Sequence, residues 1–347
     1  MSLLHDIAAR SLHILDPEDA HGLTITGLAL GMGPRARSGD PVLATQIAGL
    51  TLPNCVGLAP GFDKNAEVFA PMLAAGFGFV ECGTVTPLAQ VGNPRPRLFR
   101  LSEDRAVINR MGFNNQGLEP FAQRLSHRGP GTIGANIGAN KDAVDRIGDY
   151  VTGLERLWGL ASYFTINISS PNTPGLRALQ TKAALEELLG RLIEARDRLP
   201  PAGKVPMFLK VAPDLDDGEV EAIVETVCAN GLAGIMVSNT TISRPTLRSR
   251  YANQAGGLSG APLSKLAQVM MRRFHDANQG RLTLIGVGGI GTGEQAYARI
   301  KAGASAVQLY SALVYGGAGL VMRIRRDLAA RLRADGYTNV SQAVGVG

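Results

Sequence analysis

The sequence predicts an α/β fold: a (β/α)8 TIM barrel that follows a small N-terminal extension of two helices. From residue 54 onward, short apolar runs typical of strands alternate with segments of helical periodicity. Eight such runs occur, which matches the number of strands in a barrel of this class. No G-x-G-x-x-G follows the first run, which argues against a doubly wound sheet, the alternative fold. The expected strands lie near residues 55–59, 79–84, 132–137, 164–168, 206–211, 234–238, 283–287 and 306–310.

Helical patterns separate the expected strands. Thr292 and Gln295 have the spacing of a capping box before a helix over 293–302. A helix over 216–230 has an apolar face and ends at Asn230 and Gly231. A third helix, over 181–198, is predicted because five aliphatic residues recur on one face: Leu185, Leu188, Leu189, Leu192 and Ile193.

The chain has 347 residues, more than a typical barrel needs. The surplus lies in the extension and in two long connections, 85–115 and 239–262, so we divide the chain into an extension, 1–40, and a barrel domain, 41–347. Asp16 followed by Pro17 predicts the start of a second helix in the extension. The two helices are either a cap on the core or an element lying on a membrane, and their acidic residues favour the cap. The first helix is indicated by Leu4, Ile7, Ala8, Leu12 and Leu15.

Composition excludes several classes of function. The net charge of +6 comes without long Lys/Arg runs, so nucleic acid is not an expected partner. The three cysteines, Cys55, Cys82 and Cys228, form no C-x-x-C pair and indicate neither a disulfide framework nor a zinc site. No signal peptide or bilayer-spanning run is evident, so we expect a protein that is not integral to a membrane.

The expected strand ends share one chemistry. They carry Asn, Lys, Thr, Ser and Gly, and none carries His or Glu. In a barrel these ends converge on one mouth, where active sites form. Such groups make a metal site unexpected, but they suit a polar aromatic heterocycle with carbonyls and an anionic group. The fourth end, residues 164–175, holds two asparagines and two serines, for which a polar connection without function is the alternative.

A phosphate site is indicated after the seventh strand. The sequence Gly-Val-Gly-Gly at 286–289 leaves backbone N–H groups free to approach an anion. Thr292 then opens a helix whose N-terminus favours negative charge. Barrels often bind phosphate in the loops after strands seven and eight. A tight glycine turn without a ligand is the alternative.

The strand ends and long connections carry ten motifs that occur together: GLAPGFDK at 57–64, GTVTP at 83–87, PRLFR at 96–100, INRMGFNN at 108–115, NIG at 136–138, NISSPNTPGLR at 167–177, SNTT at 238–241, GGLSG at 256–260, GVGGI at 286–290 and QLYS at 308–311. With these motifs the sequence resembles the dihydroorotate dehydrogenase family over nearly the whole chain. Within that family it is similar to class 2, the quinone-reducing, membrane-associated type. Class 1 members use a cysteine as base in the 167–177 loop and lack the extension, whereas this chain has serines there and carries the extension.

The resemblance implies oxidation of (S)-dihydroorotate to orotate with a quinone as acceptor, in de novo pyrimidine (UMP) biosynthesis. It assigns Ser170 as the base that removes a proton from dihydroorotate, in a site that a closing loop shields from water. It also implies that Lys210 favours negative charge on the reduced flavin. The substrate would contact Lys64, Asn109, Arg110, Met111, Gly112, Phe113, Asn167, Asn172, Asn239 and Thr240. One FMN per chain would contact Pro60, Gly61, Phe62, Asp63, Lys64, Thr84, Asn136, Asn167, Lys210, Ser238, Gly260, Gly289, Tyr310 and Ser311.

The resemblance also changes the interpretation of the extension. Its two helices would form an apolar quinone channel from the membrane to the flavin, along which we place His21, Arg100 and Tyr310. We expect a monomer bound peripherally to the cytoplasmic side of the cell membrane. Deleting residues 1–40 is predicted to abolish quinone turnover and to spare flavin reduction. Five arginines would attract anionic lipid if they face the membrane: Arg95, Arg97, Arg100, Arg105 and Arg110.

Two other functions stay open on the residues alone. One is a barrel oxidoreductase that reduces NAD or fumarate, which predicts that these acceptors reoxidise the flavin faster than a quinone does. A non-catalytic barrel that binds a phosphorylated ligand would explain the glycines, but it would leave the Asn, Ser and Lys residues at the strand ends without a use.

Overall fold

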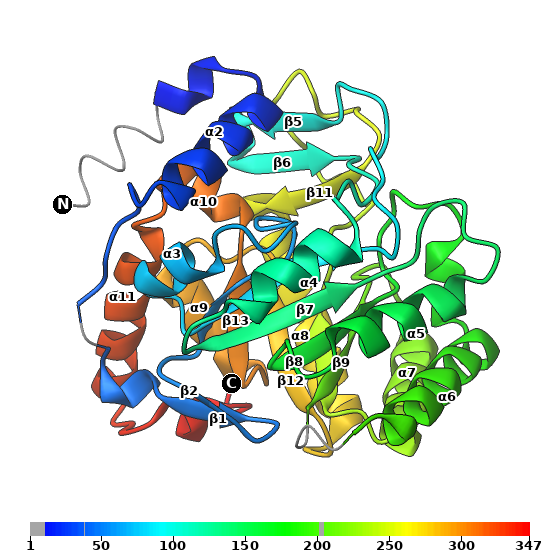
Figure 1. Cartoon of the computed structure of the whole chain (residues 1–347). Coiled ribbons are helices and arrows are strands. Elements are labelled where there is room, and N and C mark those ends of the chain that lie inside the picture. Colours follow the sequence, from blue (N-terminus) through cyan, green and yellow to red (C-terminus); the bar gives the residue numbers. More distant parts are fainter. Residues whose placement is uncertain (1–10, 38, 201–204) are drawn as a thin grey trace.

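Eight parallel strands close into a barrel, as the sequence predicts, and the doubly wound alternative is therefore wrong (Figure 1). The computed structural model describes residues 11–37, 39–200 and 205–347. Around the barrel the order is β10-β12-β13-β3-β4-β7-β8-β9, and β13 closes the ring on β3 through the pair Val307 and Val56. The strands are β3 (Val56–Leu58), β4 (Phe79–Val85), β7 (Thr132–Ile137), β8 (Tyr163–Asn167), β9 (Met207–Val211), β10 (Gly234–Val237), β12 (Thr283–Val287) and β13 (Ala306–Leu309).

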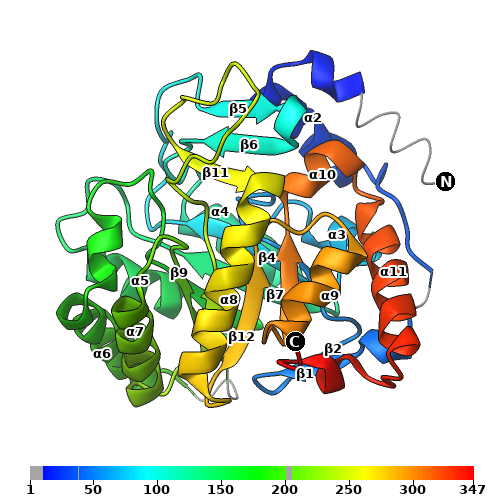
Figure 2. The same cartoon turned by 180° about the vertical axis from the view of Figure 1, so that it is seen from behind.

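Helices follow the strands and form the outer ring, most clearly seen from behind in Figure 2. The predicted capping box at α9 is only half formed: Thr292 accepts the Gln295 N–H, but the Gln295 side chain accepts the N–H of Gly291 instead. The predicted helices 181–198 and 216–230 are α6 and α7, with their leucine and valine faces buried. The helices are α3 (Phe69–Ala74), α4 (Leu118–Ser126), α5 (Arg146–Leu157), α6 (Lys182–Arg198), α7 (Asp217–Ala229), α8 (Ser264–Asn278), α9 (Gly293–Lys301), α10 (Ser311–Gly316) and α11 (Leu320–Ala334).

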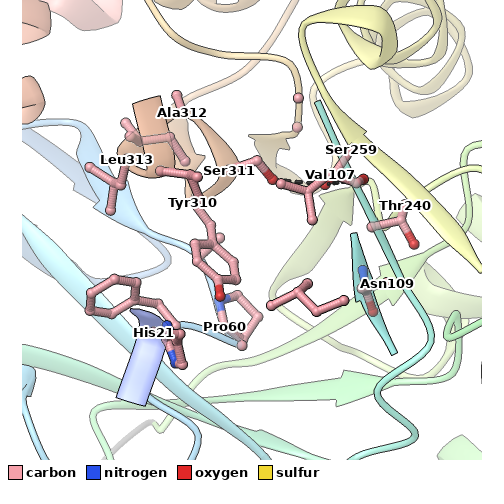
Figure 3. A pocket seen from close by; sticks show the side chains of 18 of the residues that line it. His21, Pro60, Val107, Asn109, Thr240, Ser259, Tyr310, Ser311, Ala312 and Leu313 are labelled. Carbon is pink, nitrogen blue, oxygen red and sulfur yellow. Dashed lines mark hydrogen bonds between the residues drawn. The ribbon is translucent and has the colours of Figure 1, made fainter. Parts of the chain in front are cut away.

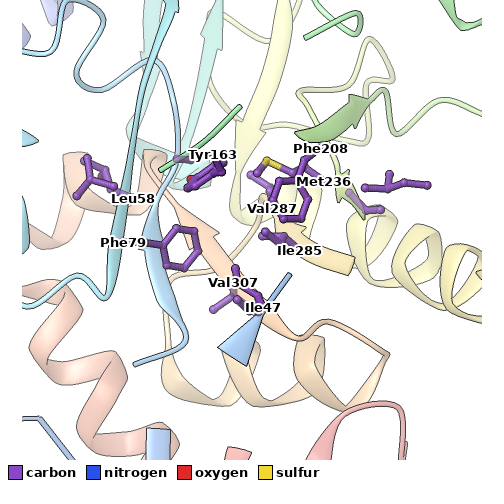
Figure 4. Close-up of a cluster of buried hydrophobic side chains, with 14 of the residues drawn as sticks. Ile47, Leu58, Phe79, Tyr163, Phe208, Met236, Ile285, Val287 and Val307 are labelled. Atoms are coloured by element: carbon purple, nitrogen blue, oxygen red, sulfur yellow. The ribbon is translucent and has the colours of Figure 1, made fainter. Parts of the chain in front are cut away.

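Aromatic side chains fill the barrel interior (Figure 4). Tyr163 lies between Phe79 and Phe208, with ring centroids 6.4 and 5.6 Å away. Glycines on neighbouring strands make the room, since a Cβ on Gly57 would lie 2.4 Å from Phe79 and one on Gly134 would lie 2.1 Å from Tyr163. The hairpin of β1 (Thr45–Ile47) and β2 (Leu50–Leu52) covers the lower end. The barrel is therefore packed below, and a ligand can enter only at the carboxyl ends of the strands.

The two long connections pair with each other, which the sequence did not predict. They supply β5 (Leu98–Leu101), β6 (Ala106–Asn109) and β11 (Gly257–Gly260), an antiparallel sheet of order β11-β6-β5. This sheet has a small core of its own, including Phe99, Ile108 and Leu258. Figure 1 shows it lying over the carboxyl ends of the barrel strands, where it forms a roof.

The described part of the extension packs beside this roof. Helix α2 (Pro17–Ala29) begins as predicted, because the Asp16 side chain accepts the N–H groups of Glu18 and Asp19. Residues 1–10 of the predicted first helix lie outside the described residues, and its remainder is a single turn, η1 (Leu12–Ile14). Within the ranges described, no helix combines the length and the apolar character needed to cross a bilayer.

Candidate active site

One cavity of about 770 Å³ lies between the barrel mouth, the roof sheet and α2. Nearly all predicted site residues line it, from the polar strand ends at one side to the extension at the other. Those on its wall are His21, Pro60, Gly61, Phe62, Lys64, Thr84, Arg100, Asn109, Met111, Gly112, Phe113, Asn167, Ser170, Asn172, Lys210, Ser238, Asn239, Thr240, Gly260, Gly289, Tyr310 and Ser311.

Three predicted residues do not line the cavity. The buried carboxylate of Asp63 accepts the N–H groups of Glu67 and Val68, at 2.7 and 2.8 Å, and so holds the loop that carries Lys64. The guanidinium of Arg110 lies over the ring of Phe99, 4.6 Å from its centroid. Asn136 lies behind Thr84, from which it accepts a hydrogen bond. Contact of these three with a ligand stays a prediction.

The loop after β8 presents Ser170 at the polar end of the cavity. Strand β8 ends at Asn167, and Pro171 and Pro174 keep the following loop out of the sheet. Ser170 is 6% exposed, and its hydroxyl oxygen accepts the N–H of Asn172 at 3.2 Å. The Asn172 amide donates to Asn109 Oδ1 of the roof at 3.3 Å. The base candidate therefore lies beside Asn172, which links it to the roof, and it is shielded from bulk water.

Ser169, to which the sequence assigned no chemistry, organises the neighbouring amides. It is fully buried; its hydroxyl donates to Asn167 Oδ1 at 3.0 Å and accepts from the Asn239 amide at 2.9 Å. These two hydrogen bonds fix the orientation of both side-chain amides: Asn167 turns its oxygen, and Asn239 its NH2 group, toward Ser169. Arg177 holds the same loop from behind, because it donates to the Ser169 carbonyl at 3.2 Å and to the Thr240 carbonyl at 3.1 Å.

Two lysines make the cavity electropositive. Burial lowers the pKa of Lys64 to about 8, while the carboxylate of Glu18 on α2 acts to raise it. Burial also lowers the pKa of Lys210, and Glu81 opposes that shift. A dry cationic pocket of this kind favours an anionic ligand, because a bound carboxylate restores the charge that burial disfavours.

Glu81 is a buried carboxylate that sequence reasoning missed. It accepts hydrogen bonds from Asn136 at 2.7 Å, Gln308 at 2.8 Å and the Tyr163 hydroxyl at 3.1 Å. Its three partners come from three other strands, so the carboxylate ties the barrel together just beneath the cavity. The signal was present in the sequence: a single glutamate inside an apolar strand, at the middle of 79–85.

A second end of the cavity is made of backbone and glycine, as the phosphate prediction requires. Gly288 and Gly289 both have positive φ, at 94° and 69°, so their peptide groups turn where other residues would be strained. The N-terminus of α9, with Thr292 and Gln295, lies at the same end. Figure 3 shows Ser311 close to Ser259, which it reaches with a 2.8 Å hydrogen bond.

The third end is apolar and is formed by the extension. The ring of His21 meets the edge of Phe62, with centroids 5.4 Å apart, and Tyr310 lies 6.2 Å from His21 (Figure 3). Burial, assisted by the charge of Lys64, lowers the pKa of His21 to about 3, so this imidazole is neutral at physiological pH. Arg100 donates to the carbonyl of His13 at 2.9 Å. The three residues predicted for the channel thus lie in one cavity with the polar and glycine-rich ends.

The hypothesis of five lipid-facing arginines is wrong for Arg97. Its side chain is 7% exposed and its guanidinium binds the Glu18 carboxylate at 2.6 Å. Arg95 pairs with the same carboxylate at 3.2 Å but remains 58% exposed. Arg97 is therefore occupied within the protein, where it holds α2 to the roof.

The fold and this cavity are typical of a barrel enzyme, with a site at the carboxyl ends of the strands that is large enough for a cofactor-sized ligand. Residues 42–332 match the model of the dihydroorotate dehydrogenase family. The chain belongs to the dihydroorotate dehydrogenase family.

Its relatives are of the quinone type, which confirms the class 2 resemblance. The chain is 56% identical to the dihydroorotate dehydrogenase (quinone) of Parvibaculum lavamentivorans over 346 residues, covering 99% of this chain and 98% of the relative. It is 55% identical to that of Rhodospirillum rubrum over 334 residues, covering 95% and 91%. The crystal structure of the Eimeria tenella dihydroorotate dehydrogenase in complex with ferulenol is similar, with a TM-score of 0.92, 39% identity and 95% of both chains covered. Its ligand-free form matches with a TM-score of 0.92 and 40% identity, covering 95% of this chain and 99% of that one.

Proposed function

We propose that this chain oxidises (S)-dihydroorotate to orotate with FMN as cofactor and a quinone as acceptor, in de novo pyrimidine biosynthesis. The observation that supports this most is the division of one cavity into three ends. The polar end suits a ring with amide and carboxylate groups, the glycine-rich end suits a phosphate, and the apolar end suits a quinone.

The residues present fit FMN. Its phosphate would lie at Gly260, Gly289 and the α9 N-terminus, where backbone N–H groups and the helix dipole favour an anion. Its ring would lie across the strand ends, beside Lys210, Asn167 and Thr84. When bound, FMN supplies the two-electron redox chemistry of the reaction. Lys210 would favour negative charge on a bound flavin ring.

Ser170 acts as the base toward dihydroorotate in this proposal. A serine hydroxyl is a weak base, so it depends on orientation and on exclusion of water. The N–H of Asn172 points at the Ser170 oxygen and would stabilise negative charge that develops there. Lys64 would hold the substrate carboxylate, while Asn109, Asn167, Asn172, Asn239 and Thr240 would bind the ring edges.

The quinone would enter beside α2, past His21, Arg100 and Tyr310. In this helix and the turn after it, Leu23, Leu30 and Met32 are each more than half exposed, and Leu23 and Met32 also line the cavity. Such apolar residues suit the surface of a bilayer, where quinones reside. These residues support our proposal that the protein binds peripherally to a membrane, with residues 1–40 as its membrane-proximal unit. We further propose, from the class 2 resemblance, a monomer at the cytoplasmic face of the cell membrane.

The visible spectrum of the purified protein tests this proposal. A flavin band should bleach anaerobically on addition of dihydroorotate and return on addition of a quinone. Return with NAD or fumarate at a higher rate than with quinone would contradict the proposed acceptor. A protein without a flavin band, even after supply of FMN, would contradict the proposed cofactor.

A further inference from the structure

Arg299 on α9 is a buried cation without a carboxylate partner among the described residues. Its side chain is 1% exposed, and in the described part of the chain only Arg97 is comparably buried among the arginines. Arg97 has the Glu18 carboxylate at 2.6 Å. Arg299 has only two carbonyl oxygens, of Val287 at 3.4 Å and Ser264 at 3.3 Å, and its Nε has no partner in the described structure.

Such an arrangement costs free energy in the absence of an anion. Removing a guanidinium from water is strongly unfavourable unless charge or good hydrogen bonds replace the lost hydration. Burial lowers the pKa of Arg299 to about 10, so the group still carries its positive charge at neutral pH. The protein therefore keeps an uncompensated charge at this place.

The position of Arg299 indicates which anion compensates it. Val287 directly precedes the glycine pair, and Ser264 packs against it, since a Cβ on Gly289 would lie 2.3 Å from Ser264 Cα. Of the two residues whose carbonyls Arg299 reaches, Val287 thus lines the glycine-rich end and Ser264 lies directly behind it, against Gly289. Gln295, which lines the cavity, is four residues before Arg299 and so lies on the same face of α9. Gly286 allows the side chain to pass, because a Cβ there would lie 2.4 Å from Arg299 Cγ.

We propose that Arg299 is a buried counter-charge for the phosphate of the bound flavin nucleotide, acting from behind the glycine turn without touching the ligand. This inference rests on the proposed function and extends it to a positioning residue that does not line the cavity. Arg299 adds a full positive charge to the partial charge of the α9 dipole. The site has a low dielectric, where charges a few Å apart interact more strongly than in water.

Comparison of FMN with riboflavin, which lacks the phosphate, isolates this effect. Affinities of the flavin-free protein for both are measured by quenching of flavin fluorescence, for wild type, Arg299→Met and Arg299→Lys. We expect Arg299→Met to weaken FMN binding on the order of 10- to 100-fold, with riboflavin affinity unchanged. Arg299→Lys should keep most of the preference for FMN, because the charge remains. Arg299→Gln replaces the Met variant if the latter does not fold.

Arg325 on α11 provides the matched control. It is also partly buried with an unpartnered Nε and donates to a carbonyl, that of Gly76, away from the cavity. Arg325→Met should leave the ratio of FMN to riboflavin affinity as in wild type. An equal loss of both flavins in Arg299→Met, or the same loss of FMN in the Lys variant, would show that Arg299 is merely structural. Failure of the wild type to bind FMN would instead overturn the proposed function.

Discussion

The carboxylate of Glu18 accepts the Nη2 and Nε hydrogens of Arg97, at 2.6 and 3.0 Å, and so joins the extension to the roof of the site. The remaining Nη1 donates to the carbonyls of Val91 and Asn93, and the Asn93 amide reaches the carbonyl of Asn172 at 3.3 Å. Burial alone would raise the pKa of Glu18, but Arg97 and Arg95 bring it below its usual value, so the carboxylate is charged at neutral pH. Helix α2, at the apolar end of the cavity, is thus linked to the loop that carries Ser170.

Replacement of Arg97 with Met should therefore loosen α2. Loss of Arg97 leaves the largely buried Glu18 carboxylate with only the exposed Arg95 as ion-pair partner, and we expect the free energy of unfolding to fall by about 3 kcal/mol. Quinone-dependent turnover should fall more than the rate of flavin reduction by dihydroorotate, measured by stopped flow. Arg95→Met is the control, because Arg95 is 58% exposed and should contribute little. Equal effects of the two variants would refute this role of the ion pair.

Affinity for orotate should fall as the pH rises through about 8. Burial lowers the pKa of Lys64 to about 8 in the ligand-free protein, and only the protonated ammonium attracts the carboxylate. The dissociation constant, followed by the flavin spectrum, should be level below this pH and rise about tenfold per pH unit above it. In Glu18→Gln the break should move to lower pH, because the Glu18 carboxylate raises the pKa of Lys64. A constant affinity between pH 7 and 9.5 would be inconsistent with a lysine anchor.

The two adjacent serines should give different kinetic phenotypes. Ser170→Ala should lower kcat by about 10²-fold or more while FMN stays bound, because it removes the base. Ser169→Ala should mainly raise KM, by about tenfold, since it releases the Asn167 and Asn239 amides that we propose bind the substrate. Steady-state kinetics with flavin content as control separates the two. Unchanged turnover in Ser170→Ala would overturn its assignment as base.

Replacement of the buried Glu81 should lower the stability of the fold. In Glu81→Leu three buried donors, on Asn136, Tyr163 and Gln308, lose their acceptor. We expect the free energy of unfolding, from urea denaturation, to fall by about 3–5 kcal/mol. The control, Glu119→Gln, removes a carboxylate from an exposed ion pair with Arg156 and should change the free energy of unfolding little. Similar effects of the two substitutions would contradict a structural role of the buried network.

Removal of the extension should abolish the reaction with quinone and spare the reduction of the flavin by dihydroorotate. We place the deletion at residues 1–34, because Asp40 pairs with Arg333 at 2.6 Å and Ala36 bonds to the Ala74 carbonyl. The deletion removes Glu18, the carboxylate partner of Arg97. The deletion variant therefore also carries Arg97→Met, so that no buried guanidinium is left without its partner. Quinone turnover should be lost, whereas anaerobic bleaching of the flavin by dihydroorotate should persist. Quinone turnover at the wild-type rate would refute the channel.

The barrel was predictable because its signals are local. Each strand is an apolar run, and each helix, such as α6 with Leu185 and Leu188, repeats on one face. The roof was not predictable, because β5, β6 and β11 are four-residue strands that pair only after the barrel brings their connections together. Glycine-rich β11 has little strand propensity of its own and depends on its pairing with β6.

The site residues divide in the same way. Residues at strand ends, such as Lys64 and Asn167, were found because the barrel places all such ends at one mouth. Ser169, Glu81 and Arg299 were missed because their roles depend on partners from other elements. A buried serine, glutamate or arginine looks like an ordinary polar residue until its neighbours are known.

The cavity draws its wall from Leu12 to Ala318, and the barrel closes only when β13 meets β3. During synthesis, therefore, nearly the whole chain must leave the ribosome before a flavin site exists. A chain that stops short of the last strand has both the substrate loop and Lys64 but no glycine-rich end closed against them. The cofactor can then bind only to a chain whose synthesis is nearly complete, because no shorter fragment contains an intact site.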